Sequence, residues 1–134
     1  MPGTEERGST ALLQAISNAM VGLHKEQFGR GPTHARSNFA GADTLVCTLR
    51  DVLLPAEISM VKMGARERVR ESRIHFQAAT ADAFVTAVEE LVHRKVVAFA
   101  SGLDPDANVV FETFSFEPQL SRNGDGGLPA AASP

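Results

Sequence analysis

The chain turns from helix to strand within one stretch, Phe28-Gly29-Arg30-Gly31-Pro32-Thr33-His34-Ala35-Arg36. Glycine can adopt positive φ, and proline lacks the N–H that a continuing helix requires, so an amphipathic helix must end here. Gly29, Gly31 and Pro32 are therefore predicted to form a structural turn. Arg30 and Arg36 stand in or just beyond this turn, where we expect them to face an anion or a partner.

The segment before the turn has the pattern of a helix with one buried stripe. Its apolar side chains recur at three- and four-residue spacing, at Leu12, Leu13, Ile16, Met20 and Leu23. Ser9 or Thr10 is the predicted N-cap, and the helix is predicted to end near Phe28. After the turn, residues 34–40 and 44–49 are predicted to form two strands of a hairpin.

The second half of the chain repeats this order with more helix. Pro55 is suited to the first turn of a second helix, in which Gly64 indicates a kink or a break. Thr80 is the predicted N-cap of a third helix, and residues 96–101 and 108–117 are rich in strand-forming residues. The order α-ββ-αα-ββ predicts an α+β two-layer domain, with an antiparallel sheet of two hairpins and helices on one face.

Length and composition indicate one domain with polar ends. A chain of 134 residues that is 43% hydrophobic can bury one core. Residues 1–8 are polar, and residues 118–134 are rich in Pro, Gly, Ala and Ser, so we predict that both ends are disordered. The single domain is then predicted to span residues 9–117.

Charge and cysteine content favour a cytoplasmic protein. The formal net charge is −3, which argues against nucleic acid as a partner. No stretch approaches about 18 continuous apolar residues, and the first residues lack the apolar core of a signal peptide, so no membrane insertion is expected. Cys47, the lone cysteine, lies in an apolar run and is interpreted as a small core residue.

Arginines supply the most prominent candidate binding residues. Arg66, Arg70 and Arg73 share one helical face at i, i+4 and i+7. One interpretation is a solvated face neutralised by neighbouring glutamates, and another is an internal network of salt bridges. In the third, this ridge binds an anion or an acidic partner together with Arg30 and Arg36.

The sequence contains no arrangement typical of a catalytic or metal site. Gly29-Arg30-Gly31 follows a helix rather than a strand, so it is interpreted as a helix end and not as a phosphate-binding loop. The four histidines lack metal-ligand spacing, and His24 is predicted to lie on the polar flank of the first helix. We therefore predict no catalytic residue, metal or cofactor. Enzymatic activity stays open, and a non-enzymatic protein is favoured.

Several segments together resemble one bacterial family. They are Ile16 to Pro32, which ends in Phe28-Gly29-Arg30-Gly31-Pro32, then Ala35-Arg36, Val69-Arg70-Glu71, Phe76, Val88-Glu89-Glu90-Leu91, Arg94-Lys95-Val96-Val97-Ala98-Phe99 and Asp104. This pattern, over about residues 11–117, is similar to the family of domains of unknown function labelled Na+-translocating membrane potential-generating system, MpsC-like. The resemblance implies an accessory role beside an ion or inorganic-carbon uptake system. It implies no catalytic residue or substrate.

Two functions follow as expectations. The first is a non-enzymatic cytoplasmic interaction module that uses the arginines to bind an anionic ligand or an acidic partner. A membrane transport subunit, to which the module would bind peripherally, is one such partner. The alternative is a small enzyme or ligand sensor for a phosphorylated or carboxylated molecule, with Arg30, Arg36 and Arg70 as anion-binding groups and His34 as acid or base. Because a sheet with helices on one face leaves its other face open, we also predict a homodimer.

Overall fold

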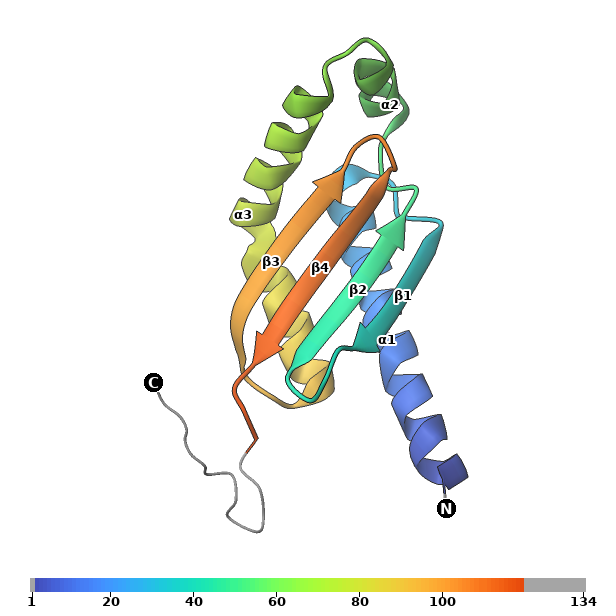
Figure 1. Cartoon of the computed structure of the whole chain (residues 1–134), viewed down its shortest axis with the longest axis vertical. Coiled ribbons are helices and arrows are strands. Elements are labelled where there is room, and N and C mark those ends of the chain that lie inside the picture. Colours follow the sequence, from blue (N-terminus) through green and yellow to red (C-terminus); the bar gives the residue numbers. More distant parts are fainter. Residues whose placement is uncertain (1, 120–134) are drawn as a thin grey trace.

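The computed structural model describes residues 2–119 of the chain, and the side chains of residues 9–119. One helix and then a β-hairpin form the first half of this part, and two helices and then a second β-hairpin form the second half (Figure 1). The elements are α1 (Pro2–Phe28), β1 (His34–Phe39), β2 (Thr44–Arg50), α2 (Pro55–Lys62), α3 (Arg66–Val92), β3 (Val96–Asp104) and β4 (Val109–Phe116).

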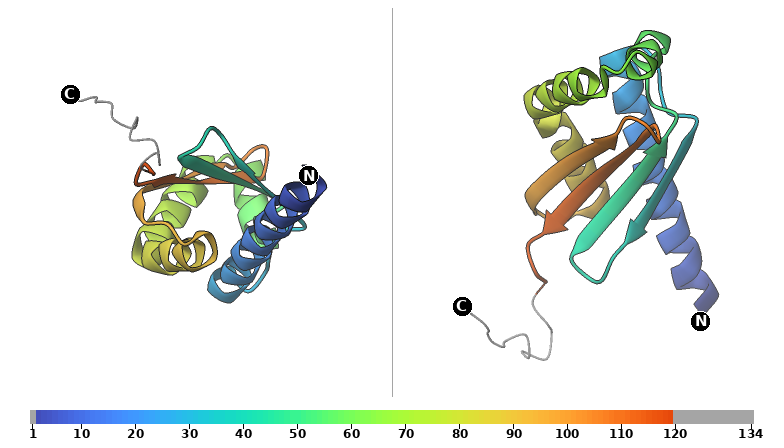
Figure 2. Two further views of the ribbon diagram at one scale, coloured as in Figure 1. Left: turned by 90° about the horizontal axis from the view of Figure 1, so that it is seen from below. Right: turned by 45° about the horizontal axis from the view of Figure 1, so that its top comes forward.

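The four strands form one antiparallel sheet in the order β1-β2-β4-β3. Each hairpin supplies two neighbouring strands, and the pairing of β2 with β4 joins the two hairpins. The long helices α1 and α3 lie on the same face of the sheet, and no helix of residues 2–119 lies on the opposite face (Figure 2). The predicted α+β fold, with an antiparallel sheet and helices on one face, is confirmed.

The strands match the predicted segments, with one change in the second hairpin. β3 continues to Asp104, past the predicted end at residue 101. The turn begins later because the Asp104 carboxylate accepts hydrogen bonds from the N–H groups of Asp106 and Ala107, both at 3.1 Å. Asn108 then takes a positive φ of 59° and leads into β4.

The helix boundaries correct two predicted caps. α1 begins at Pro2, before the predicted cap at Ser9 or Thr10, although it ends at Phe28 as expected. The break expected at Gly64 is present, with φ of 88° between α2 and α3. Thr80 is not an N-cap, because α3 runs through it from Arg66 and its hydroxyl donates to the Phe76 carbonyl one turn earlier, at 2.7 Å.

The core lies between the helices and the inner face of the sheet. Strand alternation places Leu45, Cys47 and Leu49 of β2 on this face, as predicted. The other buried apolar residues that fill the layer include Ile16 and Met20 of α1, Phe84 and Val88 of α3, and Val110, Phe114 and Phe116 of β4.

The predicted domain limits are only partly open to comparison. Residue 1 and residues 120–134, which include most of the segment predicted to be a disordered tail, lie outside the described residues. The limits of the domain at residues 9–117 stay a prediction.

Candidate functional site

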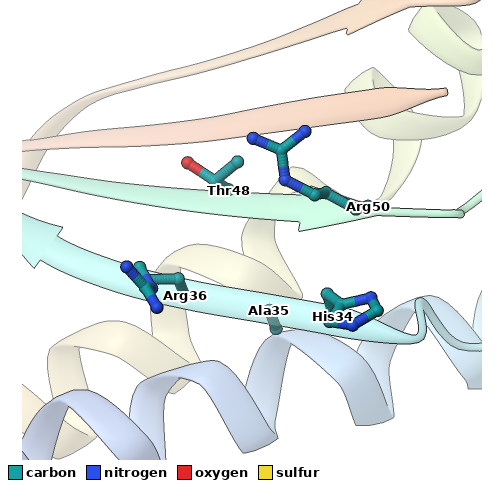
Figure 3. A pocket seen from close by; sticks show the side chains of 5 residues that line it. All are labelled: His34, Ala35, Arg36, Thr48 and Arg50. Carbon is teal, nitrogen blue, oxygen red and sulfur yellow. The ribbon is translucent and has the colours of Figure 1, made fainter. Parts of the chain in front are cut away.

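The open face of the sheet carries a cluster of basic and polar side chains. Residues with even numbers in β1 and β2 point to this face, because side chains alternate along a strand. The register sets His34 opposite Arg50 and Arg36 opposite Thr48. Together with Ala35, these four residues line a hollow of about 420 Å³ (Figure 3). We call it the β1–β2 hollow.

The two guanidinium groups at the β1–β2 hollow are available to an anion. Arg36 and Arg50 are exposed, and among the described residues neither forms an ion pair. His34 lies beside them, with its Nδ1 atom 3.1 Å from the Thr33 hydroxyl. A planar guanidinium donates paired hydrogen bonds to a carboxylate or a phosphate, so the hollow has the donors that such a group requires.

The other predicted arginine near the turn has a partner inside the molecule. Arg30 donates to the Asp51 carboxylate at 2.8 Å, and both side chains are partly exposed. This ion pair ties the turn after α1 to the end of β2. Arg30 does not line the β1–β2 hollow, so the structure brings Arg36 and His34 together but leaves Arg30 apart.

The expected cationic ridge on α3 is absent, because its three arginines have different surroundings. Arg66 is paired with Glu67 at 2.8 Å and with Asp106 at 2.9 Å, on the surface. Arg70 is partly buried, and its Nε atom has no hydrogen-bond partner within residues 9–119. Arg73 is only 3% exposed, which removes it from any surface that a ligand could contact.

Arg73 is instead a structural residue that joins three elements. Its guanidinium donates to both carboxylate oxygens of Glu57 in α2, at 2.6 and 2.8 Å, and to the Val52 carbonyl at 3.0 Å. It also lies over the Phe28 ring, 3.7 Å from the centroid, at the end of α1. Of the interpretations left open by the sequence, the internal salt bridge is therefore the right one for Arg73.

The surroundings of Glu57 lower the pKa of its carboxyl group. Burial raises the pKa of its carboxyl group, but the hydrogen bonds from Arg73 and from the Leu54 N–H, with the charge of Arg73, hold the pKa below its usual value of 4.5. Glu57 is therefore ionised at neutral pH, and the pair is a true ion pair.

The glycines of the turn meet different requirements. Gly29 follows α1 with φ of 78°, and its N–H donates to the Lys25 carbonyl at 2.8 Å, so it ends the helix as predicted. Gly31 does not have a positive φ. It is restricted by space, because a Cβ atom there would lie 3.1 Å from Val21 Cγ1 and 3.2 Å from the Val21 carbonyl oxygen. Pro32 is buried beside this contact.

Sequence reasoning missed a polar network inside the core. His24 is 1% exposed rather than on a polar flank, and its Nε2 atom lies 2.9 Å from the Glu112 carboxylate, which is fully buried. The Gln77 amide donates to the same carboxylate oxygen at 2.9 Å. One feature of the sequence could have indicated this network: Glu112 is a charged residue at an inward-facing position of an otherwise largely apolar strand.

Cys47 is adjacent to this network and is a core residue, as predicted. It pairs with Glu112 across β2 and β4, and its sulfur accepts a hydrogen bond from the Ser37 hydroxyl at 3.3 Å. Burial raises the pKa of the Cys47 thiol to about 11, the Ser37 bond opposes this, and the nearby Glu112 charge adds to it. The thiol is therefore protonated and shielded from solvent.

Residues 9–119 contain no group of three or more His, Cys, Asp and Glu side chains that could hold a metal ion. Among the helices described, none has the length and apolar character needed to cross a membrane.

The fold and the β1–β2 hollow define a small α+β domain with an unpaired cationic site on an open sheet face. The chain belongs to the family described as Na+-translocating membrane potential-generating system (MpsC), whose model matches residues 9–118. This confirms the family resemblance seen in the sequence. Comparison with curated proteins and with solved structures gave no match.

Proposed function

We propose that this chain is a non-enzymatic accessory module of a Na+-linked membrane-potential system, and that it binds an acidic segment of its partner at the β1–β2 hollow. The observation that carries the proposal is the pair of exposed guanidinium groups, Arg36 and Arg50, which have no ion-pair partner among the described residues. Family membership supplies the link to the membrane system.

The arrangement of the basic residues favours docking over catalysis. An enzyme that uses Arg30, Arg36, Arg70 and His34 requires these side chains to meet in one pocket. Of these four residues, only Arg36 and His34 line the hollow, while Arg30 is paired with Asp51. Two neighbouring guanidiniums on a sheet face suit the carboxylates of a partner segment, because each can form a bidentate hydrogen-bonded pair.

The proposed setting is the cytoplasm, beside a membrane subunit of an ion or inorganic-carbon uptake system. A protonated, buried Cys47 is compatible with a reducing compartment. The chain then contributes a binding surface to the complex, while movement of ions across the bilayer belongs to membrane-spanning subunits.

Calorimetric titration with a short polyglutamate peptide tests the proposal. We expect binding at low salt, with Arg36→Ala and Arg50→Ala each weakening the affinity about tenfold, the effect of losing one charge-assisted contact. Arg68→Ala removes the same charge from an exposed position on α3 and serves as the control. The proposal fails if all three variants weaken binding equally, or if the peptide does not bind.

Inorganic phosphate in the same titration tests the alternative of a small enzyme or sensor. One observation favours that alternative: His34, whose imidazole is the acid or base that the alternative requires, lies beside both arginines in the hollow. Phosphate that binds more tightly than the peptide, with affinity lost in His34→Ala, would replace docking by small-anion recognition.

A further inference from the structure

β3 is an edge strand without the features that usually protect one. It lies at the end of the sheet order β1-β2-β4-β3, so one of its sides is not paired with any of the described residues. From Val96 to Leu103 it contains no charged residue and no proline. Edge strands that must stay unpaired are commonly protected by lysine, proline or a short length, because their free N–H and C=O groups can pair with another chain.

The adjacent face of α3 is apolar where a solvent-facing helix is usually charged. From Ile74 to Ala81 the helix has no Lys, Arg, Asp or Glu. Ile74 is 51% exposed, and Ala78 is exposed as well. A groove of about 210 Å³ separates this helix face from β3, and its lining includes Ile74, Ala78, Ala81 and Phe99. We call it the α3–β3 groove.

The charges at the two ends of β3 indicate what covers the edge. β3 is preceded by exposed Lys95 and ends at exposed Asp104. α3 runs in the opposite direction to β3 (Figure 1). The start of α3 lies near the end of β3, as the 2.9 Å pair of Arg66 with Asp106 shows.

We propose that the partner at this edge is a second copy of the chain, with the two β3 strands antiparallel about a twofold axis perpendicular to the sheet. In this arrangement Lys95 of each copy faces the end that carries Asp104 in the other. A parallel arrangement would oppose like charges at both ends of β3, so the charge pattern selects the antiparallel dimer.

The dimer buries the unpaired side of β3 and the apolar face of α3. The free backbone groups of β3 pair across the seam, and the sheet becomes continuous through both copies. The apolar faces of the two α3 helices meet beneath the seam, where alanines allow a close approach. Because the axis is perpendicular to the sheet, both β1–β2 hollows lie on the same side of the dimer. The proposal rests on β3 and α3 and is independent of what the hollows bind.

Light scattering coupled to gel filtration tests the interface with the full chain. At micromolar concentrations we expect twice the chain mass of 14.3 kDa. Ala78→Glu places carboxylates in the α3–β3 groove of both copies, and we expect it to raise the dissociation constant about tenfold or more. Ala79→Glu makes the same change at an exposed position outside the groove lining and should leave the mass unchanged. Circular dichroism checks that both variants are folded.

Crosslinking through introduced cysteines distinguishes the proposed β3–β3 interface from other dimer interfaces. Ala100→Cys lies in the middle of β3, and Thr113→Cys lies opposite it on β4. Across the proposed seam the Thr113 positions are separated by three strand spacings, about 14 Å, so a bismaleimide of shorter reach should link only the Ala100 variant. A chain of monomer mass, a dimer that persists in Ala78→Glu, or equal crosslinking of Thr113→Cys would each overturn the proposal.

Discussion

Replacing Arg73 with alanine should destabilise the protein far more than replacing a surface arginine. The guanidinium is 3% exposed and forms a bidentate pair with Glu57, whose side chain is 15% exposed. Removing one member of a buried ion pair costs about 3–5 kcal/mol, because the other charge is left without its partner. Since Glu57 keeps some contact with water, we expect the lower end of that range, about 3 kcal/mol.

Urea unfolding followed by circular dichroism measures this change. A loss of about 3 kcal/mol corresponds to a fall in melting temperature of roughly 10 °C or more for a domain of this size. Arg66→Ala is the matched control, because its ion pairs are exposed and should contribute at most about 1 kcal/mol. Equal losses in the two variants would refute the structural role that we assign to Arg73.

The pH dependence of stability gives a second, independent measurement. The pKa of Glu57 is lowered in the folded chain, so its contribution to the free energy of unfolding is present above the usual carboxyl pKa of 4.5. This contribution is lost as the pH falls below 4.5 through the pKa of the folded state. In Arg73→Ala that part of the acid sensitivity should disappear. A variant whose stability falls as steeply as that of the natural chain would show that the pair is not the source.

Three other predictions address the turn and the core. Gly31→Val should cost about 1–3 kcal/mol in thermal melts through overpacking against α1, whereas Gly22→Ala, where a Cβ meets nothing within 4 Å, should stabilise α1 by about 0.5–1 kcal/mol. Arg30→Ala should cost at most about 1 kcal/mol, because its pair with Asp51 is partly exposed, and a larger loss would show a buried role. Cys47 should resist a thiol reagent at pH 8 until the chain unfolds, and rapid labelling of the folded chain would contradict its burial. Because the pKa of the Cys47 thiol is raised in the folded chain, only the unfolded thiol ionises between pH 9.0 and about 11, so the free energy of unfolding should fall as the pH rises through that range.

Local patterns were sufficient for most of the architecture. The helix end at Gly29 and the alternation of Leu45, Cys47 and Leu49 depend on backbone preferences and on one buried face, which neighbouring residues in the sequence specify. The helix caps were less predictable. Thr80 has a residue type that favours caps, yet its hydroxyl can also bond within a helix, and packing of α3 against the sheet decided between the two.

The candidate site required the register of the sheet. Arg36 was recognisable as an exposed cation beside the turn, but Arg50 becomes its neighbour only because β1 and β2 pair with His34 opposite Arg50. The three arginines at i, i+4 and i+7 of α3 appeared equivalent in the sequence. Helical spacing says which residues share a face, but it does not say what packs against each point of that face.

By itself, the sequence determined the order of helices and strands, the antiparallel two-layer class and the family, since these depend on periodicity, turn residues and the spacing of motifs along one chain. The tertiary structure alone decided the environments of the charges. It buried Arg73 against Glu57 and His24 against Glu112, and it left Arg36 and Arg50 on the open face of the sheet, with no ion-pair partner in the described part of the chain. The physical reason is that the state of a charge depends on solvent access and on partners distant in the sequence, which only the packing of the elements supplies.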